Sequence, residues 1–390
     1  MSNIPKLRFP EFSGEWEERK IQDFAECCAG ATPDTKKDEY WIDGTIPWMS
    51  SGEVNNTFIY STEKKITQLG YDKTSTKLLP SNTVVIALAG QGKTRGTVAI
   101  TRIELCTNQS LCAVLPDITL NSEYLFYFLS SQYKQLRNSS TGGDESRGGL
   151  NLKIIGNFRL PYTSFSEQQK IADFLSNVDS IITAETKILS TLQKKKKALL
   201  QKLFTQQFRF KSNDGTDFPA WEEKKVIDFA KVDTGANNTQ DKVEDGPYPF
   251  YVRSPIIYRS NKYIFDFPEA VLTVGDGVGT GKVFHYVQGK FDCHQRVYVI
   301  HDFENVLGKY FYFYFSEKFY ARVKPMSAKN SVDSVRREMI IDMKIPIPCK
   351  AEQQKIADFL SNMDSLIQTQ QKVVTTWQQR KKALLQQMFI

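Results

Sequence analysis

The sequence contains two copies of one segment, and this repetition constrains the fold more than any other feature. The string "EQQKIADFLSN" occupies residues 167–177 and recurs unchanged at residues 352–362. Extended to residues 166–204 and 351–389, the two copies agree at about 24 of 39 positions without a gap. Agreement over that length indicates a tandem duplication, so the chain is expected to build one structural unit twice.

Weaker similarity continues upstream of each copy. "WEERKIQDFA" from Trp16 pairs with "WEEKKVIDFA" from Trp221, "YLFYFL" from Tyr124 pairs with "YFYFYF" from Tyr310, and Pro161 pairs with Pro346. At the offset of the long segment, Gly90, Gly92 and Gly96 fall opposite Gly275, Gly277 and Gly281. The pattern predicts four segments, which are a variable module at 1–163, a near-identical segment at 164–208, a second module at 209–348 and a second near-identical segment at 349–390.

The near-identical segments are predicted to be long helices with a heptad seam. Apolar residues recur in steps of four and three, which is typical of helices that pair along their length. The seam residues are Ile171, Leu175, Val178, Ile182, Leu189, Leu192, Leu199 and Leu203, and in the second copy Ile356, Leu360, Met363, Ile367, Val374, Trp377, Leu384 and Met388. Polar residues interrupt both seams at the same two places, at Glu185 and Lys196 and at Gln370 and Lys381.

Polar seam residues cost stability but set the register of a helix pair. Packing of the two helices on separate cores is the alternative, and matching along the full seam favours mutual pairing. A helix of some 38 residues is roughly 55–60 Å long. Proline-containing stretches, "RLPYTSFS" and "IPIPCKA", precede each copy and mark where the helices begin.

The variable modules have a mixed pattern. "NTVVIALAG", "TVAITRI" and "QSLCAVLPD" are predicted strands, and "EAVLTVGDG", "KVFHYV" and "QRVYVIHD" follow in the same order in the second module. "YFYFYF" alone fits a strand, but its counterpart spaces Leu125, Phe128, Leu129 and Leu136 as a helix does, behind a cap at Asn121 or Ser122. Both are therefore predicted to be helices, and the fold class is α+β.

Composition excludes several classes of protein. The formal charge of +7 is a mild basic excess that is compatible with an anionic partner. The six cysteines form no CxxC pair, so we expect reduced thiols, and Cys293 with His294 lacks a second ligand pair at zinc spacing, which favours core or loop positions. No metal site is expected. Without a signal segment or a long apolar run, the chain is expected in the cytoplasm.

The stretch "VVIALAGQGKTRGTVAI" at residues 84–100 raises the hypothesis of a nucleotide-binding P-loop. A P-loop needs a helix after its glycine loop, to present an N-terminus to phosphate. Here "RGTVAITRI" predicts a strand instead, and the second module keeps the glycines but not Gly-Lys-Thr. The glycines are better explained by a turn between two strands that needs positive φ. The sequence also contains no hydrolase, metalloprotease or methyltransferase motif and no persuasive nuclease carboxylate cluster, which favours a non-catalytic binding protein.

Taken together, two variable modules, each followed by a near-identical helix entered through Pro and Glu-Gln-Gln-Lys-Ile, resemble the specificity subunit of type I restriction–modification systems. "FPEFSGEWEERKIQDFA" and "SVRREMIIDMKIPIP" are also similar to that family. The resemblance implies two pseudo-twofold-related target-recognition domains separated by two long antiparallel coiled-coil helices. It further implies a DNA reader without its own active site or cofactor.

The same resemblance implies what the partners do. Each recognition domain would read one half of a bipartite, asymmetric site on double-stranded DNA, and the helices would act as spacer and as docking surface for two modification (methyltransferase) subunits. Restriction subunits with translocase activity would join them. S-adenosylmethionine, ATP and Mg are expected in those partners only. The rival hypothesis is a helical scaffold or adaptor whose two modules bind proteins.

Candidate DNA-binding residues lie in loops whose side chains can reach phosphate or base edges. Ordinary solvated loop residues are the alternative for each one taken singly. The candidates are Gln91, Lys93, Thr94, Arg95, Ser140, Thr141, Arg147 and Lys153 in the first module, and Asn237, Asn238, Gln240, Asp276, Lys282, Ser327, Lys329, Asn330, Arg336 and Arg337 in the second.

Overall fold

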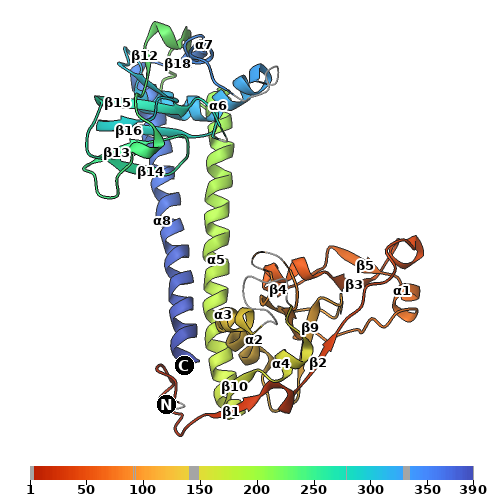
Figure 1. Ribbon diagram of the computed structural model, residues 1–390. Coiled ribbons are helices and arrows are strands. Elements are labelled where there is room, and N and C mark those ends of the chain that lie inside the picture. Colours follow the sequence, from red (N-terminus) through yellow and green to blue (C-terminus); the bar gives the residue numbers. More distant parts are fainter. Residues whose placement is uncertain are drawn as a thin grey trace. The chain divides into compact units, whose positions relative to one another are not determined.

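The computed structural model describes residues 4–90, 92, 94–139, 149–277, 279–327 and 334–389. Contacts divide the chain into two compact units, Met1–Thr186 with Lys372–Ile390 and Lys187–Gln371. The two long helices are α5 (Phe165–Phe204) and α8 (Lys350–Met388), and each contributes one part to each unit (Figure 1). Mixed α/β modules and long helices agree with the predicted α+β class. Among the described helices, none combines the length and apolar character needed to cross a bilayer.

The first unit is built on a five-stranded sheet. Its strand order is β2 (Ala25–Ala29), β9 (Leu111–Pro116), β6 (Val84–Ala87), β7 (Val98–Thr101) and β4 (Phe58–Ile59). Val84 and Ile86 face one hydrophobic core, which α2 (Ser122–Ser131) and α5 complete, and Val85 and Ala87 face another. Because both faces are covered, the central strands are continuous apolar runs rather than alternating ones.

Smaller elements surround this sheet. The strands are β5 (Lys64–Ile66), β3 (Ile46–Met49) and β8 (Cys106–Thr107) in one sheet and β1 (Glu17–Lys20) with β10 (Arg159–Tyr162) in another. The short helices are α1 (Gln68–Asp72), α3 (Tyr133–Asn138) and α4 (Leu152–Gly156), with 3-10 turns at Ile21–Asp23, Asp38–Tyr40 and Ser51–Asn56.

The second unit has a six-stranded sheet of the same plan. Its order is β12 (Lys231–Thr234), β17 (Val297–His301), β15 (Phe265–Val274), β16 (Phe284–Cys293), β13 (Tyr248–Tyr251) and β14 (Ile257–Ser260). Strands β11 (Glu222–Lys225) and β18 (Lys344–Ile347) form a pair like β1 and β10. The remaining elements are α6 (Gly308–Ser327), α7 (Arg337–Ile341) and 3-10 turns at Val226–Asp228 and Thr239–Asp241.

The aromatic segments are helices in both units, as predicted. The Asn121 side chain caps α2 by accepting a hydrogen bond from the backbone N–H of Tyr124 at 2.9 Å. "YFYFYF" lies inside α6, where Tyr310, Phe311 and Phe315 are fully buried. A strand hydrophobic on both faces and a helix buried on most sides share one composition, so the repeat was needed to tell them apart.

The seam residues of both long helices are buried or half-buried, and in each unit the helices pair. In the first unit Lys381 on α8 forms an ion pair with Asp179 on α5, with 2.6 Å between Nζ and Oδ1. In the second unit Lys196 on α5 forms the equivalent ion pair with Asp364 on α8. The start of one helix lies beside the end of the other in each case, so the pairing is antiparallel. The prediction of mutual pairing is confirmed, and two of the polar seam residues are the lysines of these ion pairs.

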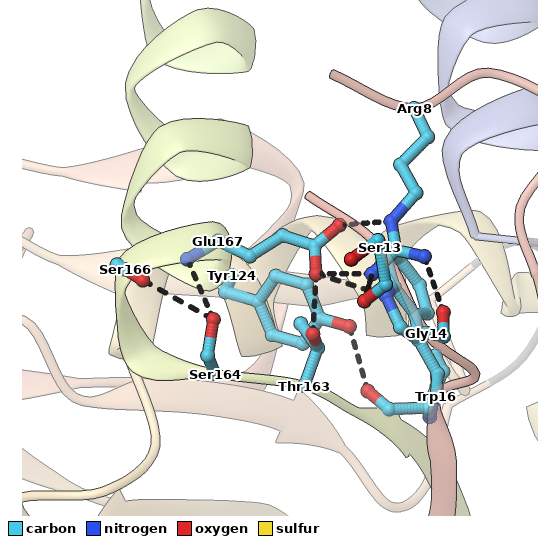
Figure 2. Close-up of polar contacts among 10 residues, drawn as sticks. Arg8, Ser13, Gly14, Trp16, Tyr124, Thr163, Ser164, Ser166 and Glu167 are labelled. Carbon is cyan, nitrogen blue, oxygen red and sulfur yellow. Dashed lines mark hydrogen bonds and ion pairs between the residues drawn. The ribbon is translucent and has the colours of Figure 1, made fainter. Parts of the chain in front are cut away.

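A buried carboxylate anchors the beginning of α5 (Figure 2). Glu167 is 1% exposed and accepts hydrogen bonds from Arg8 Nε at 2.7 Å, Arg8 Nη2 at 2.8 Å and Trp16 Nε1 at 3.1 Å, and also from the hydroxyl of Thr163. Burial opposes the charged form most strongly, but the hydrogen bonds from Arg8, Thr163 and Trp16 outweigh it, so the pKa of Glu167 is lowered. The Arg8 guanidinium also donates to the carbonyls of Ser13 and Gly14.

The same arrangement anchors α8. Glu352 is fully buried and accepts from Arg209 Nε at 3.0 Å, Arg209 Nη2 at 2.7 Å and Trp221 Nε1 at 2.8 Å. The next residue satisfies backbone groups in both units. Gln353 accepts from the N–H of Leu307 and donates to the carbonyl of Pro348, and Gln168 does the same for Asn121 and Thr163. The repeated Glu-Gln pair therefore joins each helix to the module that precedes it.

Candidate nucleic-acid interface

The glycine-rich stretch at residues 84–100 is a turn between two antiparallel strands, as predicted. Strand β6 pairs with β7 in the register Val84 to Ile100, and β15 pairs with β16 in the second unit. Gly96 and Gly281 have φ of +79° and +62°, a conformation that favours glycine. A strand rather than a helix follows Thr94, so the turn presents no helix N-terminus to a nucleotide phosphate.

The ungapped pairing of Gly90 with Gly275 is wrong. The backbone N–H of Leu88 donates to Ser110 at 2.9 Å, and the N–H of Gly275 donates to Arg296 at 2.8 Å, which makes Leu88 the counterpart of Gly275. Gly96 and Gly281 remain equivalent, since their N–H groups bond to Ala87 and Val274. The first turn is therefore two residues longer, a difference that a constant offset in sequence conceals.

Two candidate loops that are far apart in sequence meet at this turn. The N–H of Leu150 donates to the carbonyl of Leu88 at 2.9 Å, and the N–H of Val335 donates to the carbonyl of Gly275 at 2.7 Å. In both units, the segment after the aromatic helix is thus hydrogen-bonded to the glycine turn. The described ends of the two candidate segments therefore lie beside each other in each module, and we call this place the edge of the module.

A third segment completes this edge in the second unit. Asn237 donates its N–H to the carbonyl of Cys293, and its carbonyl accepts from Gln295 at 2.9 Å. The Gln295 amide also donates to the Asn238 side chain at 2.7 Å. The 3-10 turn that carries the exposed Gln240 follows directly.

The edge of the second unit borders an open hollow of about 660 Å³. Its lining includes Gln295, Arg296, Asp276, Arg336 and Arg337. The Asp276 carboxylate lies 3.4 Å from the Arg253 guanidinium and 3.7 Å from that of Arg296, and both arginines are about half exposed or more. An acidic residue between two exposed arginines restrains their orientation without covering them.

Other second-module candidates lie around this hollow. Arg336 is exposed at the N-cap of α7, and Arg337 is exposed with its Nε donating to the Val232 carbonyl at 3.2 Å. Lys282 is exposed on the glycine turn, but its Nζ lies 4.8 Å from the centroid of the Tyr320 ring on α6 rather than in the lining.

The first-module candidates that the structure describes are fewer. Thr94 is half-buried in the turn, and Lys153 is exposed on α4, which the Asn151 side chain caps through the N–H of Ile154. Arg95 is 5% exposed, and this burial does not favour a contact with DNA at this residue.

Several candidates fall outside the described residues and carry no structural statement. They are Gln91, Lys93, Ser140, Thr141, Arg147, Lys329 and Asn330, together with the side chain of Ser327 at the end of α6.

Some polar residues of the edges lie at strand ends and are not among the DNA-binding candidates predicted from the sequence. Arg253, Gln295 and Arg296 line or border the second edge, and Gln109 occupies the same place in the first. They lie next to apolar strands rather than in long polar loops, so loop composition did not single them out. Aligning "TNQSLCAV" with "CHQRVYVI" places Gln109 opposite Gln295, and this shared glutamine is the sequence signal that identifies both residues.

Cys293 and His294, weighed as metal ligands, are buried beside this edge. Cys293 belongs to a hydrophobic core, and His294 accepts a hydrogen bond at Nδ1 from the N–H of Arg296 at 2.9 Å. Burial, reinforced by the nearby charge of Arg253, lowers the pKa of His294 and favours the neutral ring that this hydrogen bond needs. Within the described residues, no group of three or more His, Cys, Asp or Glu side chains is placed to hold a metal ion.

Comparisons with known proteins agree on one family. The family model described as "Type I restriction modification DNA specificity domain" matches residues 13–194 and 220–376. The type I restriction enzyme MjaIX specificity subunit of Methanocaldococcus jannaschii is 31% identical over 60% of this chain and 57% of its own length. The MjaVIII specificity subunit of the same organism is 25% identical over 97% of this chain and 92% of its own length.

Solved structures share the fold. The crystal structure of the type I restriction–modification system S subunit from M. genitalium covers 99% of both chains with a TM-score of 0.68 at 16% identity. A chain from a structural study of complex assembly in the type I R-M system covers 96% of this chain and 97% of its own length, with a TM-score of 0.57 at 14% identity. Similarity at this level of identity establishes the architecture.

Proposed function

The chain belongs to the family of type I restriction–modification DNA specificity proteins, and from that premise we propose that it reads the sequence of double-stranded DNA for enzymes carried by other chains. Each module contacts one half of a bipartite, asymmetric site. The chain itself is not catalytic. It acts in the cytoplasm, where bacterial and archaeal DNA is accessible to a protein of this kind.

The observation that carries this proposal is the repetition of one edge with different side chains. Both modules hydrogen-bond the glycine turn to the segment after the aromatic helix through equivalent backbone groups. The side chains differ, as Ser110 and Arg296 do at equivalent positions. A constant backbone frame with changed side chains is what two readers of different half-sites need, since side chains at base edges carry the sequence information.

The charge of the second edge suits an anionic partner. Four arginines, Arg253, Arg296, Arg336 and Arg337, lie at or beside the hollow, against the carboxylates of Asp276 and Glu338. Arginine forms bidentate hydrogen bonds with phosphate and with guanine, so one cluster supports both positioning and base reading.

We assign the long helices two roles, as spacer and as docking surface. Two copies of nearly the same helix present equivalent surfaces, which suits two copies of one modification subunit. Restriction subunits join that complex. S-adenosylmethionine, ATP and Mg then bind to the partner chains, and this chain contributes only the choice of DNA.

The proposal is tested by co-expressing the chain with a cognate modification subunit and sequencing the methylated genome. We expect methylated adenines in one bipartite motif. Exchanging residues 209–348 for the second module of a relative should change one half of that motif and leave the other half unchanged. Methylation without a sequence motif, or a change in both halves, contradicts the assignment.

A single substitution tests the second edge. Arg296→Ala should weaken binding to the cognate site by about 1–3 kcal/mol if this guanidinium reads a base. The loss is measured by titrating the complex with fluorescent duplexes that carry each base pair in turn. Lys224→Ala, on exposed strand β11, is the control and should leave affinity and preference unchanged.

A further inference from the structure

One polar residue is the same at the edges of both modules. Gln109 in "TNQSL" and Gln295 in "CHQRV" occupy equivalent places in the strand register, because Cys112 pairs with Ala29 as Tyr298 pairs with Thr234. The residue that follows each glutamine accepts a hydrogen bond from the glycine turn. Both glutamines are exposed, so packing in a core does not account for the identity.

Each glutamine amide is held by the turn that follows a Gly-Ala pair. The Oε1 atom of Gln109 accepts from the hydroxyl of Thr32 at 2.6 Å, and Gln295 donates to Asn238 at 2.7 Å. The glycines of these pairs lie against backbone, since a Cβ at Gly30 would come within 1.9 Å of the Thr107 carbonyl oxygen and one at Gly235 within 2.1 Å of that of Cys293. The amide is therefore oriented by a closely packed turn while it stays at the surface.

The residues beside the glutamines differ between the modules. Ser110 follows Gln109, whereas Arg296 follows Gln295 and is held by the Asp276 carboxylate. The shared residue and the changed residue are neighbours on one edge. If the modules read different half-sites and the shared glutamine contacts DNA, that contact is with a feature that both half-sites contain, and the changed residues account for the difference.

We propose that Gln109 and Gln295 donate equivalent hydrogen bonds to the DNA sugar–phosphate backbone and set the register of each module on its half-site, while Arg296, oriented by Asp276, reads a base in the second half-site. This inference rests on the proposed function. The backbone is common to every sequence, and side-chain amides are ordinary donors to it. An amide has no net charge, so its contact releases no counterion.

The test uses the full chain in complex with its modification subunit and a duplex carrying the site identified from the methylome. Gln109→Ala and Gln295→Ala should each lower affinity about fivefold, the effect of losing one hydrogen bond. The methylated motif should stay unchanged, and so should the slope of log affinity against log salt. Arg296→Ala should instead alter the second half of the motif alone.

Matched controls separate contact from fold. Gln68→Ala and Gln288→Ala remove one exposed glutamine from each module away from the edge and should leave affinity unchanged. Thr32→Val and Asn238→Ala remove the restraint on each amide and should cost less than loss of the glutamine itself. Gln295→Glu should weaken binding further than Gln295→Ala, because it places a negative charge at the phosphate.

The outcomes that overturn the inference are distinct from failure of the proposed function. Unchanged affinity in both alanine variants overturns it. Loss of affinity for one base pair only assigns the glutamines to adenine reading and overturns the backbone contact. Equal, non-additive losses for Gln109→Ala and Thr32→Val leave the glutamine a purely structural tie and overturn it as well. If the wild-type complex shows no sequence preference, the proposed function fails first.

Discussion

At the scale of single residues, the buried carboxylates at the helix entries explain why part of the sequence is repeated verbatim. Glu167 and Glu352 each join an arginine and a tryptophan from the segment that leads into their module. A buried carboxylate is stable only while its hydrogen-bond donors remain in place. Both partners must therefore be retained together, which makes this cluster intolerant of change in either copy.

Arg8→Ala should destabilise the first unit by about 3 kcal/mol, because it leaves the Glu167 charge buried with fewer donors. The change is measured by denaturant unfolding of the full chain. Arg19→Ala is the control, since its ion pair with Glu17 is exposed on both sides and is worth less than about 1 kcal/mol. Equal losses for the two variants would contradict the structural role of the cluster.

The contribution of Glu167 to the free energy of unfolding should be lost in acid. Its pKa is lowered by folding, so the stabilisation is fully present above the ordinary glutamate pKa of about 4.3 and is lost as pH falls through the lowered value. Unfolding free energy measured between about pH 7 and pH 3 should fall less steeply for Glu167→Gln than for the wild type over the acid part of this range. Parallel profiles would remove Glu167 as the source.

At the scale of elements, the polar seam positions set how the long helices pair. Asp179 with Lys381 and Lys196 with Asp364 are equivalent ion pairs, one in each unit. The lysine ammonium also lies over an aromatic ring in each case, 5.4 Å from the centroids of Tyr127 and Phe313. A shift of one heptad would separate each lysine from its carboxylate, so these contacts penalise other registers.

Reversing one charge of an ion pair tests whether the pair fixes the register of the helices. Lys381→Asp should destabilise the first unit by about 2–3 kcal/mol, because it places two carboxylates together in a largely buried site. Adding Asp179→Lys should recover a large part of that loss in a double-mutant cycle measured by thermal unfolding. Additive losses in the double variant would show that the pair does not interact.

At the scale of the whole molecule, the duplication produces two modules and two long helices. Under the proposed function, the length of these helices would set the distance between the two half-sites. We infer that the spacer between half-sites depends on the number of heptads between the modules. A test of this inference must change the length of both helices while keeping the seam and both lysine ion pairs intact.

Deleting residues 184–190 from α5 together with 370–376 from α8 removes one heptad from each helix and preserves the seam phase. The helices become about 10 Å shorter, which corresponds to about three base pairs. The methylated motif of the variant should keep both half-sites with a spacer shorter by that amount. The same spacer in an active variant would contradict the ruler role. Single-helix deletions serve as controls and should abolish methylation by breaking the register.

The sequence by itself determined the duplication, the heptad seams of two helices that pair with each other, the α+β class and the family. Each of these leaves a periodic or repeated signal along the chain. It also distinguished a strand–turn–strand from a P-loop, since the residues after Thr94 have strand periodicity. The helical state of "YFYFYF" followed from the repeat alone.

Only the tertiary structure decided which candidates share an edge and which are enclosed. Arg95 is buried, and Leu88 rather than Gly90 is the structural counterpart of Gly275. Gln109 and Gln295 lie at strand ends, next to loops that are distant in sequence. Exposure and proximity depend on hydrogen bonds between segments that no local pattern records. For that reason the architecture was predictable from the sequence, whereas the composition of the proposed DNA-reading edge was not.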